Sequence, residues 1–249
     1  MVPRWAESGG AGSGQGAPAR YDDGVTGDPH DHYFTAQPAS SAERGTIPVR
    51  LAGRDLTVET AGGIFSPGHV DLGTSVLLRS VPPLSVPDGG AVLDLGCGWG
   101  PIALTMAFEL ADTGVADATV WSVDVNERAL DLLGRNARRL GLAGVRPVRP
   151  DEVPGDVSFA AIWSNPPIRV GKEALHAMLG HWLPRLVVGG SAHLVVGKNL
   201  GADSLHAWLT TTFDSRGSQD EGTEPVIAAE VTRVASAKGF RVLEVLRTA

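Results

Sequence analysis

From residue 91 onward, expected strands and helices alternate regularly, and this alternation restricts the fold of the 249-residue chain more than any other feature. Short apolar runs that suit buried strands are separated by longer segments with helical spacing of apolar residues. The expected strands are residues 91–95, 118–123, 145–148, 157–163 and 192–196, and the expected helices are residues 101–110, 127–140, 172–187 and 202–211. Strands joined through helices form a mostly parallel sheet with helices on both faces, so we expect an α/β fold.

The end of the chain departs from this alternation. Residues 231–235 and 240–245 are expected strands with only four residues, Ser236 to Gly239, between them. Such a short connection joins antiparallel strands, because a parallel pair needs a crossover of roughly a dozen residues or more. The complete prediction is a seven-stranded, mostly parallel sheet with an antiparallel C-terminal hairpin.

The organisation of the rest of the chain follows from composition. Residues 1–28 contain almost no large aliphatic side chains, so we expect a disordered tail. Residues 29–85 are expected to form a lead-in, with a short hairpin at 47–60 and a helix at 71–80. Residues 86–249 then form the main domain, with a polar insertion at about 214–230.

Charge and cysteine content exclude several classes of protein. The net charge is 21 − 28 = −7, which excludes a wholly basic nucleic-acid coat but not a local basic patch. The single cysteine, Cys97, excludes a disulfide framework and a cysteine-rich zinc site. The histidines show no metal-ligand spacing, and no apolar run approaches the roughly 18–20 residues of a membrane helix. We therefore expect a soluble, cytoplasmic protein without a metal.

A glycine-rich turn follows the strand at 91–95. Gly96, Gly98 and Gly100 stand between this strand and the next helix, where bare backbone and free N–H groups favour a ligand. A dinucleotide fingerprint would place a third spaced glycine where Pro101 stands, and the Asp94 carboxylate would repel a pyrophosphate. The motif therefore favours a ligand with a nucleoside and an ammonium group over NAD. The alternative is a tight turn without a ligand.

Two further carboxylates follow the next two strands. Asp124 suits the hydroxyls of a ribose, as in other nucleotide-binding sheets, or else the N-cap of the helix at 127–140. Asp151 suits an adenine amino group or is an ordinary loop carboxylate, and both interpretations stay open.

The third motif, Asn165-Pro166-Pro167, follows the strand at 157–163. Its prolines remove two N–H donors, which leaves the Asn165 amide and backbone carbonyls as polar groups. Such acceptors hold the N–H bonds of an amine while its lone pair points at an electrophile. The alternative is a rigid turn with a local side-chain hydrogen bond.

Together, these motifs resemble the class I S-adenosylmethionine-dependent methyltransferases of the Asn-Pro-Pro type, which have a Rossmann-like fold. More narrowly, residues 63–66, 71–74 and 165–173 resemble the methyltransferase small domain family, and the similarity extends over residues 30–249. That family includes the RsmC-type enzymes, which methylate guanine N2 in ribosomal small-subunit RNA. The resemblance implies an N-methyltransferase with S-adenosylmethionine as cofactor and ribosomal RNA or a ribosomal subunit as partner.

The resemblance also implies roles for individual residues. The methionine part of the cofactor would lie on the glycine turn, its ribose on Asp124 and its adenine on Asp151. The residues implied in cofactor binding are Asp94, Gly96, Cys97, Gly98, Gly100, Asp124, Asn126, Asp151, Phe65 and Thr74. Asn165 and the Pro166 carbonyl would bind the target amine as the catalytic groups. The residues implied in substrate binding are Pro167, Ile168, Arg169 and Lys172.

Other functions remain as alternatives. The same chemistry would serve a protein glutamine amide or a small-molecule amine, and a non-catalytic cofactor-binding partner subunit is a further candidate. A basic stretch at 128–149 has Asp131 as its single acid, and its six arginines are Arg128, Arg135, Arg138, Arg139, Arg146 and Arg149. This stretch suits phosphate contacts or a solvated helix face, and the sequence does not choose between them.

Overall fold

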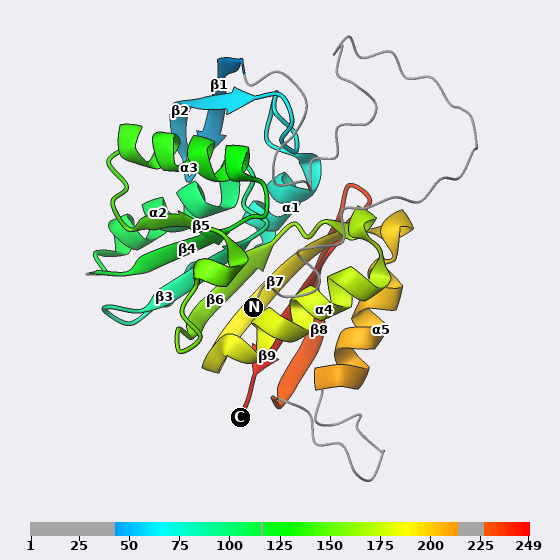
Figure 1. Cartoon of the computed structure of the whole chain (residues 1–249). Helices are drawn as coiled ribbons and strands as arrows, with labels where there is room; N and C mark the ends of the chain where they lie inside the picture. Colours follow the sequence, from blue (N-terminus) through cyan, green and yellow to red (C-terminus); the bar gives the residue numbers. More distant parts are fainter. Residues whose placement is uncertain (1–42, 116, 214–226) are drawn as a thin grey trace, which may run out of the picture.

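The computed structural model describes residues 43–115, 117–213 and 227–249. The expected disordered tail and most of the expected insertion at 214–230 lie outside the described residues. Seven strands form one sheet in the order β5-β4-β3-β6-β7-β9-β8 (Figure 1). They are β3 (Ala91–Leu95), β4 (Thr119–Val123), β5 (Val145–Val148), β6 (Phe159–Ser164), β7 (Leu186–Gly197), β8 (Ala229–Ala237) and β9 (Phe240–Arg247).

The direction of the strands confirms the predicted topology. Strands β3 to β7 pair in parallel with their neighbours. Strand β9 runs antiparallel to β7 on one side and to β8 on the other. The sheet is therefore Rossmann-like and mostly parallel, and its antiparallel hairpin is inserted so that the last strand lies inside the sheet.

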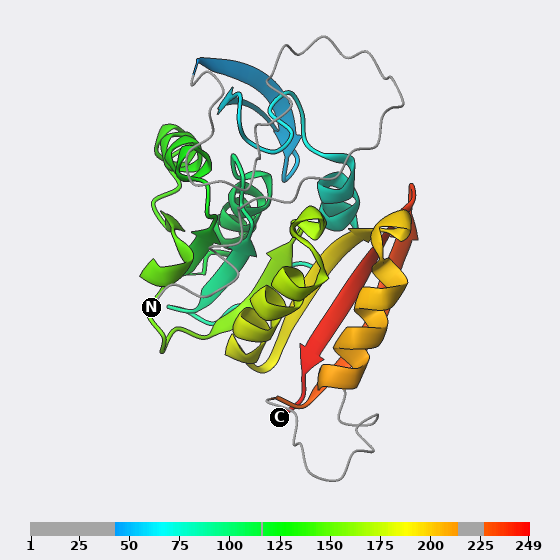
Figure 2. The ribbon, with the colours of Figure 1, turned by 45° about the vertical axis from the view of Figure 1, so that its right-hand side comes forward.

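Helices cover both faces of the sheet, as predicted. One face carries α1 (Leu72–Ser80), α2 (Pro101–Thr113) and α3 (Glu127–Arg139), and the other carries α4 (Lys172–Trp182) and α5 (Ala202–Phe213), as Figures 1 and 2 show. Successive residues of a strand point to opposite faces. Val92 accordingly belongs to the buried cluster under the first three helices, and Leu93 to the cluster under α4 and α5.

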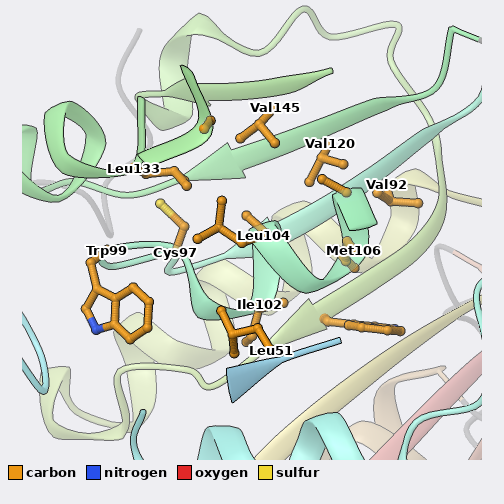
Figure 3. Packing of buried hydrophobic residues seen from close by; sticks show 14 of the residues in the cluster. Leu51, Val92, Cys97, Trp99, Ile102, Leu104, Met106, Val120, Leu133 and Val145 are labelled. Atoms are coloured by element: carbon orange, nitrogen blue, oxygen red, sulfur yellow. The ribbon is translucent and has the colours of Figure 1, made fainter. Parts of the chain in front are cut away.

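The cluster under α2 fixes this helix against the sheet. Figure 3 shows Leu104 and Met106 of α2 among Val92 of β3, Val120 of β4 and Val145 of β5. Both α2 side chains have no exposed surface. Full burial of such a side chain stabilises the folded state by about 1.5–3 kcal/mol, so this packing holds the start of α2 and the turn before it in place.

The lead-in forms the expected hairpin and helix. Strands β1 (Arg44–Leu51) and β2 (Arg54–Ala61) pair antiparallel through the turn Ala52-Gly53, where both residues have positive φ. Such two-residue turns match the natural twist of a hairpin. Figure 1 shows the hairpin beside α3, and an ion pair of 2.6 Å joins Glu59 of β2 to Arg135 of α3.

Two predicted boundaries are wrong. The helix expected at 172–187 ends at Trp182, and a short 3-10 turn, η4 (Leu183–Arg185), leads into β7 at Leu186 rather than at residue 192. Pro184 explains the early end, because proline has no N–H to continue a helix. Strand β8 begins at Ala229, so the last two residues of the expected insertion belong to the sheet.

The described helices are all short. The longest, α2 and α3, have 13 residues each, whereas a helix that crosses a bilayer needs about 20 apolar residues. Among the residues described, none of the helices meets the length and hydropathy of a membrane span.

Candidate active site

The order of the strands creates a crevice between β3 and β6. These strands are neighbours, but the chain runs outward from β3 to β4 and β5 before it returns to β6 on the other side. Open α/β sheets bind ligands at such a reversal, beyond the carboxyl ends of the strands. The glycine turn follows β3 and Asn165 follows β6, so the fold brings the two strongest motifs of the sequence together there.

A cavity of about 780 Å³ lies at this place, within the usual size of small-molecule sites. Its walls are formed by the glycine turn, the end of β4, the Asn-Pro-Pro motif and the loop at 64–71 of the lead-in. The predicted site residues that line it are Phe65, Thr74, Gly96, Cys97, Gly98, Asp124, Asn126, Asn165, Pro166, Pro167, Ile168 and Arg169. Four other predicted residues, Asp94, Gly100, Asp151 and Lys172, do not line this cavity.

Asp94 lies buried beneath the glycine turn. Its side chain has no exposed surface, and its Oδ2 atom accepts a hydrogen bond of 2.9 Å from the N–H of Ala103 in α2. Burial, together with the nearby Asp124 carboxylate, raises the pKa of Asp94 well above its usual range. Its Oδ1 atom finds no hydrogen-bond partner in the described part of the chain. A buried acceptor without a partner is costly, so this atom would gain from a donor that reached it from the cavity above.

The three glycines of the turn serve different purposes. A Cβ atom added at Gly98 would meet nothing within 4 Å, and one added at Gly96 would come within 3.9 Å of Pro167 Cδ. The missing side chains at Gly96 and Gly98 therefore leave space in the cavity. At Gly100 a Cβ atom would stand 2.2 Å from Leu133 Cδ1. Gly100 is thus required for the contact between the start of α2 and α3, away from the cavity.

Asp124 reaches across to the glycine turn. Its Oδ2 accepts from the N–H of Gly98 and its Oδ1 from the N–H of Asn126, both at 2.9 Å. Desolvation raises the pKa of Asp124 despite these two bonds. The N-cap of α3 is Asn126, whose Oδ1 accepts from the N–H of Arg128 at 3.0 Å. The alternative prediction of Asp124 as this cap is therefore wrong.

The loop of the lead-in is tied to the glycine turn and to α3. Asn126 Nδ2 donates to the Gly63 carbonyl at 2.8 Å, and Trp99 Nε1 donates to the Ser66 carbonyl at 3.1 Å. These bonds hold Phe65 at the cavity, where its side chain remains 45% exposed. Trp99 lies in the core, as the sequence predicts (Figure 3). Its hydrogen bond to Ser66 joins segments far apart in the sequence, and no local sequence pattern predicts it.

Asn165 is held by two residues of the lead-in. Its Nδ2 atom donates to Asp71 Oδ2 at 2.9 Å and to Thr74 Oγ1 at 3.0 Å. Thr74, expected on the cofactor side, thus contacts the residue expected to bind the amine. Sequence reasoning did not assign a role to Asp71, although the residue opens the motif at 71–74 and caps the helix that follows. The Asn165 Oδ1 atom accepts no hydrogen bond from the described residues.

The other predicted residues differ in their exposure and contacts. The Pro166 carbonyl accepts from the N–H of Ile168 at 2.8 Å, which leaves its second lone pair for a ligand. Arg169 is exposed at the cavity, and Lys172 is exposed at the start of α4. Asp151 lies in η2 (Pro150–Glu152) and faces Arg149 at 3.6 Å.

Cys97 is buried in the cavity wall. Burial and the two nearby carboxylates raise the pKa of its thiol well above the usual range. A thiol held protonated is a poor nucleophile, so Cys97 is suited to packing in the cavity wall rather than to attack on a substrate. In the ranges that the structure describes, no three His, Cys, Asp or Glu residues gather as a metal site would require.

Four of the six arginines at 128–149 are engaged within the protein, among them Arg146, whose guanidinium lies 5.8 Å from the ring centre of Trp121. Arg128 donates to the Gly62 carbonyl, Arg135 pairs with Glu59, and Arg149 pairs with Glu127 and Asp151. Arg138 and Arg139, at the end of α3, are exposed and form no ion pair with a described residue. Arg128, Arg135 and Arg149 hold the lead-in and the loop after β5 in place.

The residues present fit S-adenosylmethionine. The bare backbone at Gly96 and Gly98 leaves room beside a buried carboxylate that lacks a donor, and Asp124 offers acceptors at the end of the next strand. Both carboxyl groups have a raised pKa and lack a cationic partner among the described residues, so a ligand that carries positive charge would stabilise their ionised forms. A sulfonium compound with an ammonium group and a ribose has both the positive charge and the hydroxyl donors that these residues favour.

Comparison with known proteins gives the same family. The profile of the methyltransferase small domain family matches residues 55–223. Uncharacterized protein YbxB of Bacillus subtilis is 35% identical over 187 residues, which is 74% of this chain and 90% of that protein. Ribosomal RNA small subunit methyltransferase C of Chromohalobacter salexigens is 31% identical over 221 residues, 86% of this chain and 58% of that enzyme.

A solved structure supports the fold. The 16S rRNA N2-guanine methyltransferase RsmC of Thermus thermophilus, in complex with AdoMet and guanosine, aligns with a TM-score of 0.64 at 24% identity. The alignment covers 83% of this chain and 51% of that one, so the chain spans about half the length of this protein. The profile match and the fold agree with the motifs: the chain belongs to the methyltransferase small domain family and is a methyltransferase that depends on S-adenosylmethionine.

Proposed function

We propose that this protein methylates the exocyclic N2 amine of a guanine in small-subunit ribosomal RNA. The observation that carries the proposal is the orientation of the Asn165 amide, whose two N–H groups are both engaged by the lead-in. Its Oδ1 atom is therefore the end of the amide left for a ligand. An amine presents two N–H donors, which suit the two acceptors Asn165 Oδ1 and the Pro166 carbonyl together, whereas a hydroxyl presents one donor and a carboxylate none.

In this proposal, some residues of the chain bind the cofactor and others orient the target amine. Gly96, Gly98 and Asp94 would hold the methionine part of the cofactor, and Asp124 would accept from its ribose. When bound, the cofactor supplies an electrophilic methyl group: the amine lone pair forms the N–C bond, the C–S electron pair stays on sulfur, and the nitrogen then releases a proton to water. Asn165 Oδ1 and the Pro166 carbonyl orient the N–H bonds of the target amine, which aligns its lone pair.

Ribosomal RNA is the substrate that relatives and charge support. The Chromohalobacter salexigens relative is named for small-subunit ribosomal RNA, and it matches over 86% of this chain. Arg169 at the cavity and Lys172 beside it are exposed cations at the entrance, although the whole chain is acidic. A guanine within a helix would have to leave its stack to reach Asn165. This substrate also agrees with the expected location in the cytoplasm.

The decisive experiment measures transfer of a labelled methyl group from S-adenosylmethionine. Unmodified small subunits, large subunits and their deproteinised RNAs would be incubated with the wild-type protein and with Asn165→Ala. We expect label in small-subunit RNA alone, recovered as N2-methylguanine after digestion, and a loss of at least about 100-fold with the variant. Cofactor binding is measured for both proteins, so that a loss of methyl transfer is distinguished from a loss of cofactor.

The proposal fails if no RNA is labelled while the wild-type protein binds the cofactor tightly. Label in large-subunit RNA would retain the chemistry and correct the substrate. Label in protein or in a small amine, with RNA unlabelled, would favour the glutamine amide or small-molecule alternative.

A further inference from the structure

We propose that Asp71 is a positioning residue for catalysis: it fixes the Asn165 amide with Oδ1 toward the target amine, and its charge makes that oxygen a stronger acceptor. This inference rests on the proposed amine methylation. It starts from one contact, the 2.9 Å hydrogen bond from Asn165 Nδ2 to Asp71 Oδ2. The two residues are 94 positions apart in the sequence, so the fold alone brings them together.

The contact determines which end of the amide faces the cavity. An ionised carboxylate only accepts hydrogen bonds, so the atom of Asn165 that faces Asp71 must be the nitrogen. The second N–H group of that nitrogen is engaged by Thr74 Oγ1 at 3.0 Å. Rotation of the amide by 180° would place two acceptor oxygens against each other and is therefore disfavoured.

The fold holds Asp71 itself in place from several sides. It is the N-cap of α1, and its Oδ2 atom accepts from the N–H of Thr74 at 3.1 Å. A Cβ atom at Gly73 would stand 3.0 Å from Asp71 Oδ2 and 2.8 Å from the ring of Phe240. The missing side chain at Gly73 thus leaves the room in which the carboxylate meets Asn165.

Capping of α1 does not explain the charge. Asparagine and serine cap helices about as well as aspartate does. A carboxylate adds a charge-assisted hydrogen bond to the amide N–H, which is roughly twice as strong as a neutral bond. Hydrogen bonds in a chain polarise one another, so this bond draws electron density toward Asn165 Oδ1.

The polarised oxygen has its largest effect in the transition state. As the N–C bond forms, the attacking nitrogen acquires positive charge, and a more negative Oδ1 stabilises that charge. Asp71 acts through Asn165 and does not contact the amine in this arrangement. Loss of its charge should therefore lower kcat and leave the affinity for the cofactor unchanged.

The test compares Asp71→Asn and Asp71→Ser with the wild-type protein. Both substitutions retain a side-chain acceptor for the α1 cap, and Asp71→Asn also retains the size of the side chain. We expect cofactor affinity within about twofold of the wild type and a kcat for RNA that is about 10- to 100-fold lower. Turnover within twofold of the wild type in both variants would overturn the inference, as would a loss explained by weaker cofactor binding or by unfolding.

A second measurement keeps this test separate from the substrate. If the wild-type protein labels no RNA, the proposed function fails, and Asp71 is judged by NMR of the ¹⁵N-labelled Asn165 side-chain amide in the full-length protein. A hydrogen bond to a carboxylate shifts one amide proton downfield and slows its exchange with water. We expect Asp71→Ser to abolish both effects. An Asn165 signal that is the same in wild type and variant would overturn the inference for any substrate.

Discussion

Leu133 of α3 fills the space that a side chain at Gly100 would need, since a Cβ atom there would stand 2.2 Å from Leu133 Cδ1. Gly98, two residues earlier, faces open space in the cavity wall. Both glycines have positive φ, +54° at Gly98 and +102° at Gly100. Neighbouring glycines of one motif thus serve a packing contact in one case and ligand access in the other.

We predict that alanine at these two positions has different consequences. Gly100→Ala should lower the free energy of unfolding by about 1–3 kcal/mol through overpacking alone, because the side chain collides with Leu133. Gly98→Ala should cost about 1–2 kcal/mol, from its left-handed backbone, and should weaken cofactor binding more than Gly100→Ala does. Urea unfolding and calorimetric titration with S-adenosylmethionine measure the two effects. Equal losses of stability would contradict the assignment.

Binding of the cofactor should depend on pH through Asp124. Burial raises the pKa of this carboxyl. In the proposed arrangement, its ionised form would accept from both ribose hydroxyls, and protonation would remove one acceptor. Affinity should therefore fall on acidification at a pH above the usual aspartate pKa of about 3.9. Asp124→Asn should bind about 10- to 100-fold more weakly and show a flatter pH profile, as measured by titration at several pH values.

The same residue should affect stability with the opposite sign. Because the native pKa of Asp124 lies above the unfolded value, the native state binds more protons than the unfolded state between the two values. The stability contributed by the group is thus greatest below the unfolded pKa and declines as pH rises through the native pKa. We expect the free energy of unfolding of the wild type, relative to that of Asp124→Asn, to rise as pH falls through the native pKa, and a relative loss on acidification would contradict this sign.

Asn136 should contribute more to stability than its charged neighbour Arg135. The Asn136 side chain is buried, accepts from the N–H of Glu59 at 2.7 Å and donates to the Glu59 carbonyl at 3.0 Å. Asn136→Ala leaves both backbone groups unpaired and should cost about 1–3 kcal/mol for each that stays buried. Arg135→Ala removes a half-buried ion pair that leaves no backbone group unpaired, and should therefore cost less. Urea unfolding of both variants provides the comparison, and a larger loss with Arg135→Ala would refute this role of Asn136.

RNA should be held at the entrance of the cavity rather than along α3. Arg169 lines the cavity, whereas Arg138 and Arg139 lie at the far end of α3, roughly 18 Å along the helix from Asn126. Arg169→Ala should raise KM for RNA and reduce the slope of log affinity against log salt by about 1. The double variant Arg138→Ala, Arg139→Ala should leave the slope unchanged. The reverse pattern would assign the phosphate contacts to the basic stretch.

Most of the fold was predictable because its determinants are local. A buried run ending at Leu95, three glycines and a helical pattern specify strand, turn and helix without reference to the rest of the chain. The start of β7 was not predictable in this way. Leu186 and the two valines after it form a short apolar run beside Pro184, and such a run suits the end of a helix as well as a strand.

The candidate site was predictable in its motifs but not in its contacts. Gly98 and Asn165 each follow a buried strand, so their meeting at the strand reversal follows from topology. The hydrogen bonds from Asn165 to Asp71 and from Trp99 to Ser66 depend on how the lead-in folds over the sheet. Pairings of this kind join distant segments, and no local pattern in the sequence specifies them.

The loop of the lead-in has a consequence for how this enzyme can be diversified. Trp99 and Asn126 donate hydrogen bonds to the carbonyls of Ser66 and Gly63, so a segment that precedes the sheet forms part of the cavity wall. A chimera that received its lead-in from a relative would change its entrance for the substrate and the fit of its cofactor in one step. The recipient would keep both anchoring side chains, and because they donate to backbone carbonyls, a foreign loop would be accepted wherever its backbone places carbonyls at the positions of Gly63 and Ser66.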